Sequence, residues 1–156
     1  MKTTNAYHTG YGFTLVEIMV VVVIIGITAT MALPAFNKIR LASINSRFVE
    51  DCRVFAGAAE TYTLENGVYP TDTSSGALPD FADYIRDATW QEGPTIGGQW
   101  DVENNDTGGI TLMVGADGFT VTNANLQELD ERHDDGDLDT GNYRIFGTRF
   151  YHIIVE

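Results

Sequence analysis

The feature that most constrains this chain is a predominantly apolar run, residues 13–33, that contains one charged side chain, Glu17. At about 1.5 Å per residue, a helix of this length crosses a hydrocarbon layer of ~30 Å. Residues 19–25 are apolar on every side of such a helix, which suits lipid or the inside of a helix bundle. We therefore expect residues 13–33 to form a transmembrane or bundle-core helix.

A carboxylate inside such a segment needs a physical reason, because a charged side chain at the centre of a membrane helix costs roughly 2.5–3.5 kcal/mol. An ordinary signal-anchor would explain the apolar run but gives no reason for Glu17. A secretory signal peptide has a shorter apolar region, roughly 7–15 residues, and is cleaved after it. Here a small residue followed by a bulky one, Gly12-Phe13, marks the start of the run instead.

The residues Gly12-Phe13-Thr14-Leu15-Val16-Glu17, at the start of the apolar run, resemble the processing site of the type IV pilin superfamily. This superfamily includes type IV pilins and type II secretion pseudopilins. The resemblance implies that residues 1–12 are a leader, which a prepilin peptidase removes between Gly12 and Phe13. It further implies that Phe13 becomes the methylated amino terminus and that assembly depends on Glu17.

The partner of Glu17 is open at this stage. After cleavage Phe13 would carry a positively charged amine, and a carboxylate in a low-dielectric region gains most by pairing with such a group. The amine of the same chain lies about one helical turn away, and the resemblance implies that the amine of a neighbouring subunit is the alternative.

Charge counts and the resemblance disagree on orientation. The leader contains one basic residue, Lys2, whereas Lys38, Arg40, Arg47 and Arg53 follow the apolar run. The positive-inside rule by itself would place the carboxyl side in the cytoplasm. The resemblance implies a single-pass inner-membrane protein with its head in the periplasm or on the cell surface, and we follow the motif.

Beyond Leu33 the sequence predicts that the helix continues, amphipathic, through residues 34–66. Pro34 should kink it, and Asn66-Gly67 should end it with a left-handed residue. Apolar residues recur there at spacings of three and four, which predicts a face packed against the rest of the chain: Leu41, Ile44, Phe48, Cys52, Phe55, Ala59 and Tyr62.

Residues 67–156 predict a variable loop and a β-sheet head, so the expected fold class is α+β: a long helix packed against a small antiparallel sheet. Turn-rich segments separate strand candidates at 98–102, 110–114, 119–122 and 149–155. Short helices are expected at 80–86 and 123–132.

The head is acidic, and one loop concentrates this charge. The chain has 22 acidic and 9 basic residues, so nucleic acid is not an expected partner. Asp135, Asp137 and Asp139 occupy alternate positions in this loop, and in a tight turn their oxygens could converge on calcium, which takes 6–8 oxygen ligands. The spacing is not that of an EF-hand, and a solvated acidic turn is the alternative.

These patterns together predict a structural subunit rather than an enzyme. The resemblance implies these partners: membrane lipid before assembly, prepilin peptidase, an inner-membrane assembly platform and further copies of the chain in a helical filament. Two alternatives stay open: a minor or priming pseudopilin of a secretion or DNA-uptake system, and a membrane-anchored calcium-dependent binding module.

Overall fold

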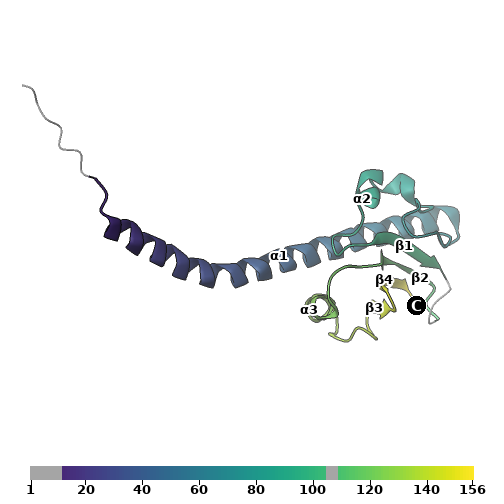
Figure 1. Ribbon diagram of the computed structural model, residues 1–156. Helices are drawn as coiled ribbons and strands as arrows, with labels where there is room; N and C mark the ends of the chain where they lie inside the picture. The colour runs from purple at the N-terminus through teal and green to yellow at the C-terminus, as the bar shows by residue number, and fades with distance from the viewer. Residues whose placement is uncertain (1–11, 105–108) are drawn as a thin grey trace, which may run out of the picture. The chain divides into compact units, whose positions relative to one another are not determined.

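The computed structural model describes residues 12–104 and 109–156 (Figure 1). The predicted leader, apart from Gly12, and part of the predicted turn after residue 104 therefore lie outside the described residues. The chain divides into two compact units, residues 1–39 and 40–156, and each is described by itself.

A single helix, α1 (Leu15–Asn66), contributes to both units. In the first unit its side chains are exposed throughout, and the helix continues through Pro34 without a break. Among the described residues, α1 is the one helix that is long and apolar enough to cross a membrane. As predicted, it ends at Asn66, and Gly67 follows with φ +72°.

The second unit is an α+β head in which a four-stranded antiparallel sheet packs against the second half of α1. The sheet has the order β1-β2-β4-β3. In Figure 1 the second half of α1 lies between the sheet and α2. The remaining elements are a 3₁₀ turn η1 (Ala82–Tyr84), α2 (Asp87–Glu92), β1 (Gln99–Asn104), β2 (Leu112–Asp117), α3 (Asn123–His133), β3 (Tyr143–Phe146) and β4 (Arg149–Val155).

The core of the head is aromatic and is built on the predicted face of α1. Phe48 stacks on Trp100 of β1, with ring centroids 5.5 Å apart and an interplanar angle of 2°. Phe55 meets the edges of both Trp90 (5.0 Å) and Trp100 (4.8 Å), so it joins α2 to the sheet. The predicted face is confirmed: Phe48, Cys52, Phe55 and Ala59 are buried, while Ile44 and Tyr62 pack partly buried against the core.

One predicted strand of the sheet was wrong, and one strand was missed. Residues 119–122 form no strand, because Thr120 and Val121 donate their backbone N–H groups to the carbonyl oxygen of Ile96 and so lead into α3. The fourth strand is β3, which pairs with β4 across a tight turn at Gly147 (φ +64°).

The helix predicted at 80–86 is also wrong in extent. The chain forms the 3₁₀ turn Ala82–Tyr84 there, and the α-helix begins later, at Asp87. The carboxylate of Asp80 accepts hydrogen bonds from the backbone and hydroxyl of Thr71, at 2.7 and 2.8 Å, which ties the start of this segment to the loop after α1. The helix predicted at 123–132 is confirmed as α3, with Leu126 and Leu129 buried.

Candidate assembly site and acidic loop

Glu17 forms a reciprocal capping box with Thr14 at the start of α1. The backbone N–H of Glu17 donates to Oγ1 of Thr14 at 3.2 Å, and Oε2 of Glu17 accepts the backbone N–H of Thr14 at 3.1 Å. The Thr14 hydroxyl donates to the same carboxylate oxygen at 3.0 Å. These bonds satisfy helix-end donors that have no partner within the helix.

Sequence reasoning missed this role of Thr14, although the signal was present. A Thr-x-x-Glu spacing in front of an apolar run is the pattern of a capping box. In the uncleaved chain, therefore, Glu17 has local hydrogen-bond donors before any amine is available. Gly12 and Phe13, the predicted cleavage pair, precede α1 and are exposed, so an enzyme could reach the peptide bond between them.

Around this box the surface is hydrocarbon. The side chains of Leu15, Val16, Ile18, Met19 and Val20 are each more than half exposed, with no part of the described chain covering them. An exposed apolar surface of this length is found where lipid or another protein covers it. Glu17 is the only charged residue of the run.

The acidic loop brings together a different set of carboxylates from the predicted one. One oxygen from each of Asp130, Asp134 and Asp135 lies within 4.8 Å of the other two. Asp130 comes from the last turn of α3, and the other two follow the helix directly. Within the described residues, Asp137 and Asp139 do not join this group.

The alternating aspartates instead build turns. Oδ1 of Asp135 accepts the N–H of Asp137 at 2.9 Å, and Oδ1 of Asp137 accepts the N–H of Asp139 at 3.1 Å. Oδ2 of Asp135 accepts the hydroxyl of Thr140 at 2.8 Å. The backbone bond from Asp137 is the largest cause that lowers the pKa of Asp135, so this carboxylate stays ionised.

Asp130 differs from its neighbours because it is fully buried. Neither of its carboxylate oxygens has a hydrogen-bond partner of normal geometry. Burial, followed by the charges of Asp134 and Asp135, raises its pKa to about 6. Asp134 is held by the N–H groups of Asn142 and Tyr143, and Gly141 leaves space for it, since a Cβ at Gly141 would lie 2.1 Å from Oδ2 of Asp134.

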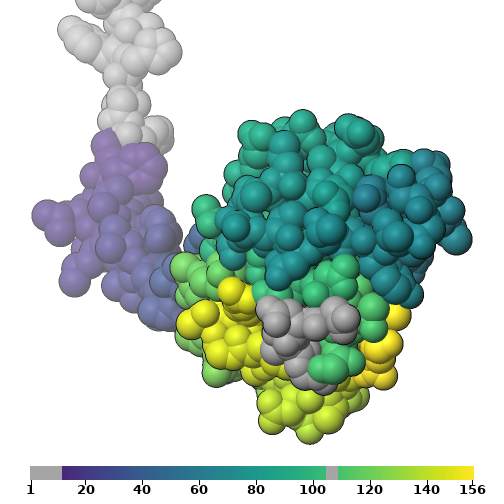
Figure 2. Space-filling model, turned by 90° about the vertical axis from the view of Figure 1, so that its right-hand side faces the viewer, coloured from purple at the N-terminus to yellow at the C-terminus, as the bar shows by residue number. Residues whose placement is uncertain are grey.

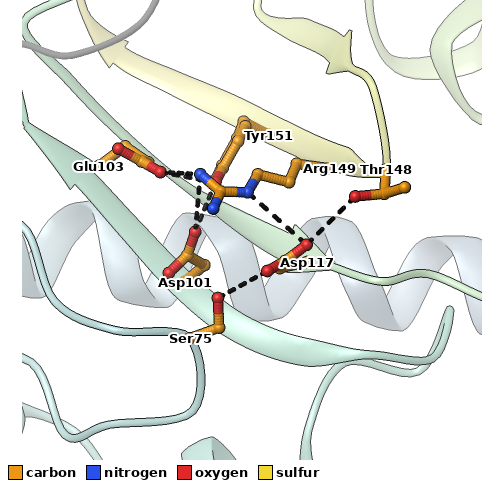
Figure 3. A network of polar contacts seen from close by, with 7 residues as sticks. All are labelled: Ser75, Asp101, Glu103, Asp117, Thr148, Arg149 and Tyr151. Carbon is orange, nitrogen blue, oxygen red and sulfur yellow. Dashed lines mark hydrogen bonds and ion pairs between the residues drawn. The ribbon is translucent and has the colours of Figure 1, made fainter.

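A second polar cluster lies on the sheet face that points away from α1 (Figure 3). Arg149 of β4 contacts Glu103, Asp101 (3.8 Å) and Asp117 (3.6 Å), and the hydroxyl of Tyr151 donates to Asp101 at 2.5 Å. Ser75 donates to Asp117 at 2.7 Å, so the cluster also fastens the loop before α2 to the sheet. It joins segments distant in sequence, and no local pattern predicted it.

The comparisons with known proteins concern the amino-terminal part of the chain. Residues 11–33 match the family model "Prokaryotic N-terminal methylation motif". Type II secretion system core protein G of Klebsiella pneumoniae is 40% identical over 60 residues, which cover 38% of this chain and 43% of that protein. The corresponding protein of Vibrio cholerae is 42% identical over 60 residues, covering 38% and 41%.

A type IV pilin is also similar to this part of the chain. Type IV major pilin protein PilE of Neisseria gonorrhoeae is 34% identical over 67 residues, which cover 43% of this chain and 40% of the pilin. The chain thus spans less than half the length of these relatives. No solved structure is a significant match.

The motif at residues 11–33, the helix that carries it and these relatives define a class: proteins with a prepilin-type amino terminus on a long apolar helix. Within that class, the motif and the named relatives support the superfamily of type IV pilins and type II secretion pseudopilins.

Proposed function

We propose that this protein is a structural subunit of a type IV pilus-like filament or type II secretion pseudopilus, and not an enzyme. The observation that carries the proposal is Glu17, a lone carboxylate at the start of an otherwise uncovered apolar helix. Lipid would cover that helix before assembly, and the helices of other copies would cover it afterwards. A membrane anchor needs the apolar run but not the carboxylate.

The chemistry follows from the capping box. Before cleavage, the donors of Thr14 hold the Glu17 carboxylate, and they are neutral. Cleavage between Gly12 and Phe13 creates a cation nearby, and charge-assisted bonds are roughly twice as strong as neutral ones. The amine of Phe13, from the same or a neighbouring chain, would therefore draw the carboxylate into an ion pair that sets the register of packed helices.

Two substitutions separate the charge of Glu17 from its capping role. Glu17→Gln keeps an acceptor for the N–H of Thr14 but removes the charge, whereas Glu17→Val removes both. We expect both variants to enter the membrane normally and to form few or no filaments, as judged by membrane fractionation and electron microscopy. Glu131→Gln, on the exposed surface of α3, is the matched control.

Filaments from Glu17→Gln at the wild-type level would contradict the role of the Glu17 charge in assembly, whereas a wild-type chain that forms no filament would favour the membrane-anchored binding module. If this chain is instead a minor or priming subunit, it will form filaments only when another subunit is present.

Processing of the amino terminus is tested by a separate measurement. In cells that contain the peptidase, intact mass spectrometry should find a chain that begins at methylated Phe13. A chain that still begins at Met1 would contradict the proposed cleavage between Gly12 and Phe13.

We further propose that the acidic loop binds calcium. Asp130, Asp134 and Asp135 would supply the carboxylate oxygens, and the two orphaned oxygens of buried Asp130 support this. Hard oxygen donors of this kind suit calcium, which also accepts backbone carbonyl groups and water. The predicted ligands Asp137 and Asp139 would act mainly by shaping the turns around the site.

A further inference from the structure

An apolar groove of about 300 Å³ lies at the end of the head where α1 finishes. Its walls come from the last turns of α1 and from the strands β2 and β4, and Figure 2 shows these segments next to each other on one side of the head. Leu64 is 86% exposed there, so its apolar side chain is available for contact. The groove is lined by Glu60, Thr63, Leu64, Tyr69, Leu112, Ile154 and Val155.

The same chain carries an exposed segment of matching chemistry just after the transmembrane run. Phe36 and Ile39 are 65% and 68% exposed, and Lys38 and Arg40 flank Ile39. Positions 36, 39, 40 and 43 share one face of a helix, because residues three and four apart are neighbours on the helix surface. This face offers two apolar side chains and a guanidinium.

The charges of the two surfaces are complementary. Residues 60–92 contain seven acidic side chains (Glu60, Glu65, Asp72, Asp80, Asp83, Asp87 and Glu92) and one basic one, Arg86. Residues 36–47 contain three basic side chains and no acidic one. Glu60, at the wall of the groove, is therefore placed to face a cation on an incoming helix.

We propose that this groove is the docking site for the 36–43 face of a second copy of the chain. The apolar side chains Phe36 and Ile39 would enter the groove, and Arg40 would meet Glu60 at its rim. The inference rests on the proposed filament function and names the contact that holds one head to the next subunit. In parallel copies it sets an axial offset of about 30 Å, the separation of Arg40 and Glu60 along α1.

Disulfide cross-linking tests the contact in the full chain. Ser43→Cys with Leu64→Cys introduces two exposed thiols that lie about 31 Å apart along α1, whereas a disulfide requires Cα atoms within about 7 Å. Any bond between them must therefore join two chains. We expect oxidation of assembled filaments to give a ladder of covalent multimers, and each single variant to give none, because Cys52 is buried.

Charge reversal supplies an independent test. Arg40→Glu or Glu60→Arg alone should reduce filament yield about tenfold, since like charges then face each other, and the double variant should recover most of it. Glu131→Arg, on the exposed surface of α3, is the control and should assemble normally. Equal membrane levels of all variants show that each one folds.

The outcomes separate this inference from the proposed function. Suppose that the chain with both Ser43→Cys and Leu64→Cys forms filaments but gives no disulfide-linked multimers, and that the double charge variant shows no recovery. This result would overturn the docking site and leave the filament function in place. A groove that is occupied by lipid or detergent, rather than by a second copy, would also give no multimers and no recovery. A wild-type chain that forms no filament under any condition would instead remove the function on which the inference rests.

Discussion

Thr14 and Glu17 satisfy each other's hydrogen-bonding groups at the point where the chain enters its apolar helix. The arrangement reduces the cost of placing a carboxylate in hydrocarbon, because the charge is hydrogen-bonded from the start. It also holds the carboxylate close to the place where cleavage would create an amine. Thr14 thus caps the start of α1 and also positions the Glu17 carboxylate near the amine that cleavage would create.

Thr14→Val tests this at the residue scale. Valine has nearly the same shape but no oxygen, so the cap is lost, at a cost of about 1 kcal/mol. In the full chain in detergent micelles, we expect the backbone N–H of Glu17 to exchange with solvent about fivefold faster, as measured by NMR hydrogen exchange. Thr14→Ser keeps the hydroxyl and should behave as the wild type; equal exchange in all three proteins would contradict the capping role.

At the scale of elements, Gly115 shows why the sheet tolerates a tyrosine that reaches across three strands. Gly115 of β2 pairs with Asp101 of β1 on one side and with Tyr151 of β4 on the other. A Cβ at Gly115 would lie 2.1 Å from the carbonyl oxygen of Phe150 and 2.7 Å from the ring of Tyr151. The missing side chain lets the tyrosine hydroxyl reach Asp101.

Gly115→Ala should therefore destabilise the head by about 1–3 kcal/mol, the range for overpacking in a filled core. Urea unfolding followed by tryptophan fluorescence is the measurement, since Trp90 and Trp100 are both in the core. Gly57→Ala is the control: it lies on the exposed side of α1 with nothing within 4 Å, so it should raise stability by about 0.5–1 kcal/mol. Equal stability of the Gly115→Ala variant and the wild type would contradict this prediction. It would mean that β2 and β4 can move apart to accommodate the added methyl group without loss of stability.

The elements also show how far the sequence could lead. The extent of α1, its buried face and its end at Asn66 follow from local periodicity and from Gly67, so they were predicted. The strand β3 was missed because it has only four residues and its pairing depends on β4, although Gly147-Thr148 was a usable turn signal. The 119–122 segment has strand-like composition, but contacts with Ile96 decide its path, and those are not local.

At the scale of the whole molecule, calcium should stabilise the head if the proposed site is correct. Binding adds ~2.7 kcal/mol at a hundredfold excess over the dissociation constant, or a rise in melting temperature of about 5–10 °C for a chain of this size. Differential scanning calorimetry of the full chain, in calcium and in chelator, is the measurement. Magnesium should raise the melting temperature less, because it demands a smaller and stricter octahedron.

Two variants identify the ligands. Asp130→Asn removes the buried charge, so it should abolish the calcium dependence and stabilise the head in chelator. Asp137→Asn should leave most of the dependence if Asp137 only shapes a turn, and abolish it if the alternating aspartates are the ligands. A melting temperature that does not respond to millimolar calcium would leave the loop as a solvated turn with a costly buried carboxylate.

The position of Cys52 has a practical consequence for following assembly. It is the only cysteine of the chain, it is completely buried, and burial raises the pKa of its thiol well above the usual range. The thiolate is the reactive form, so maleimide dyes and oxidants should leave the folded wild-type protein unmodified. Any cysteine placed on the surface then becomes a unique attachment point, and growth of a fluorescent polymer could be watched in real time without first deleting a native thiol.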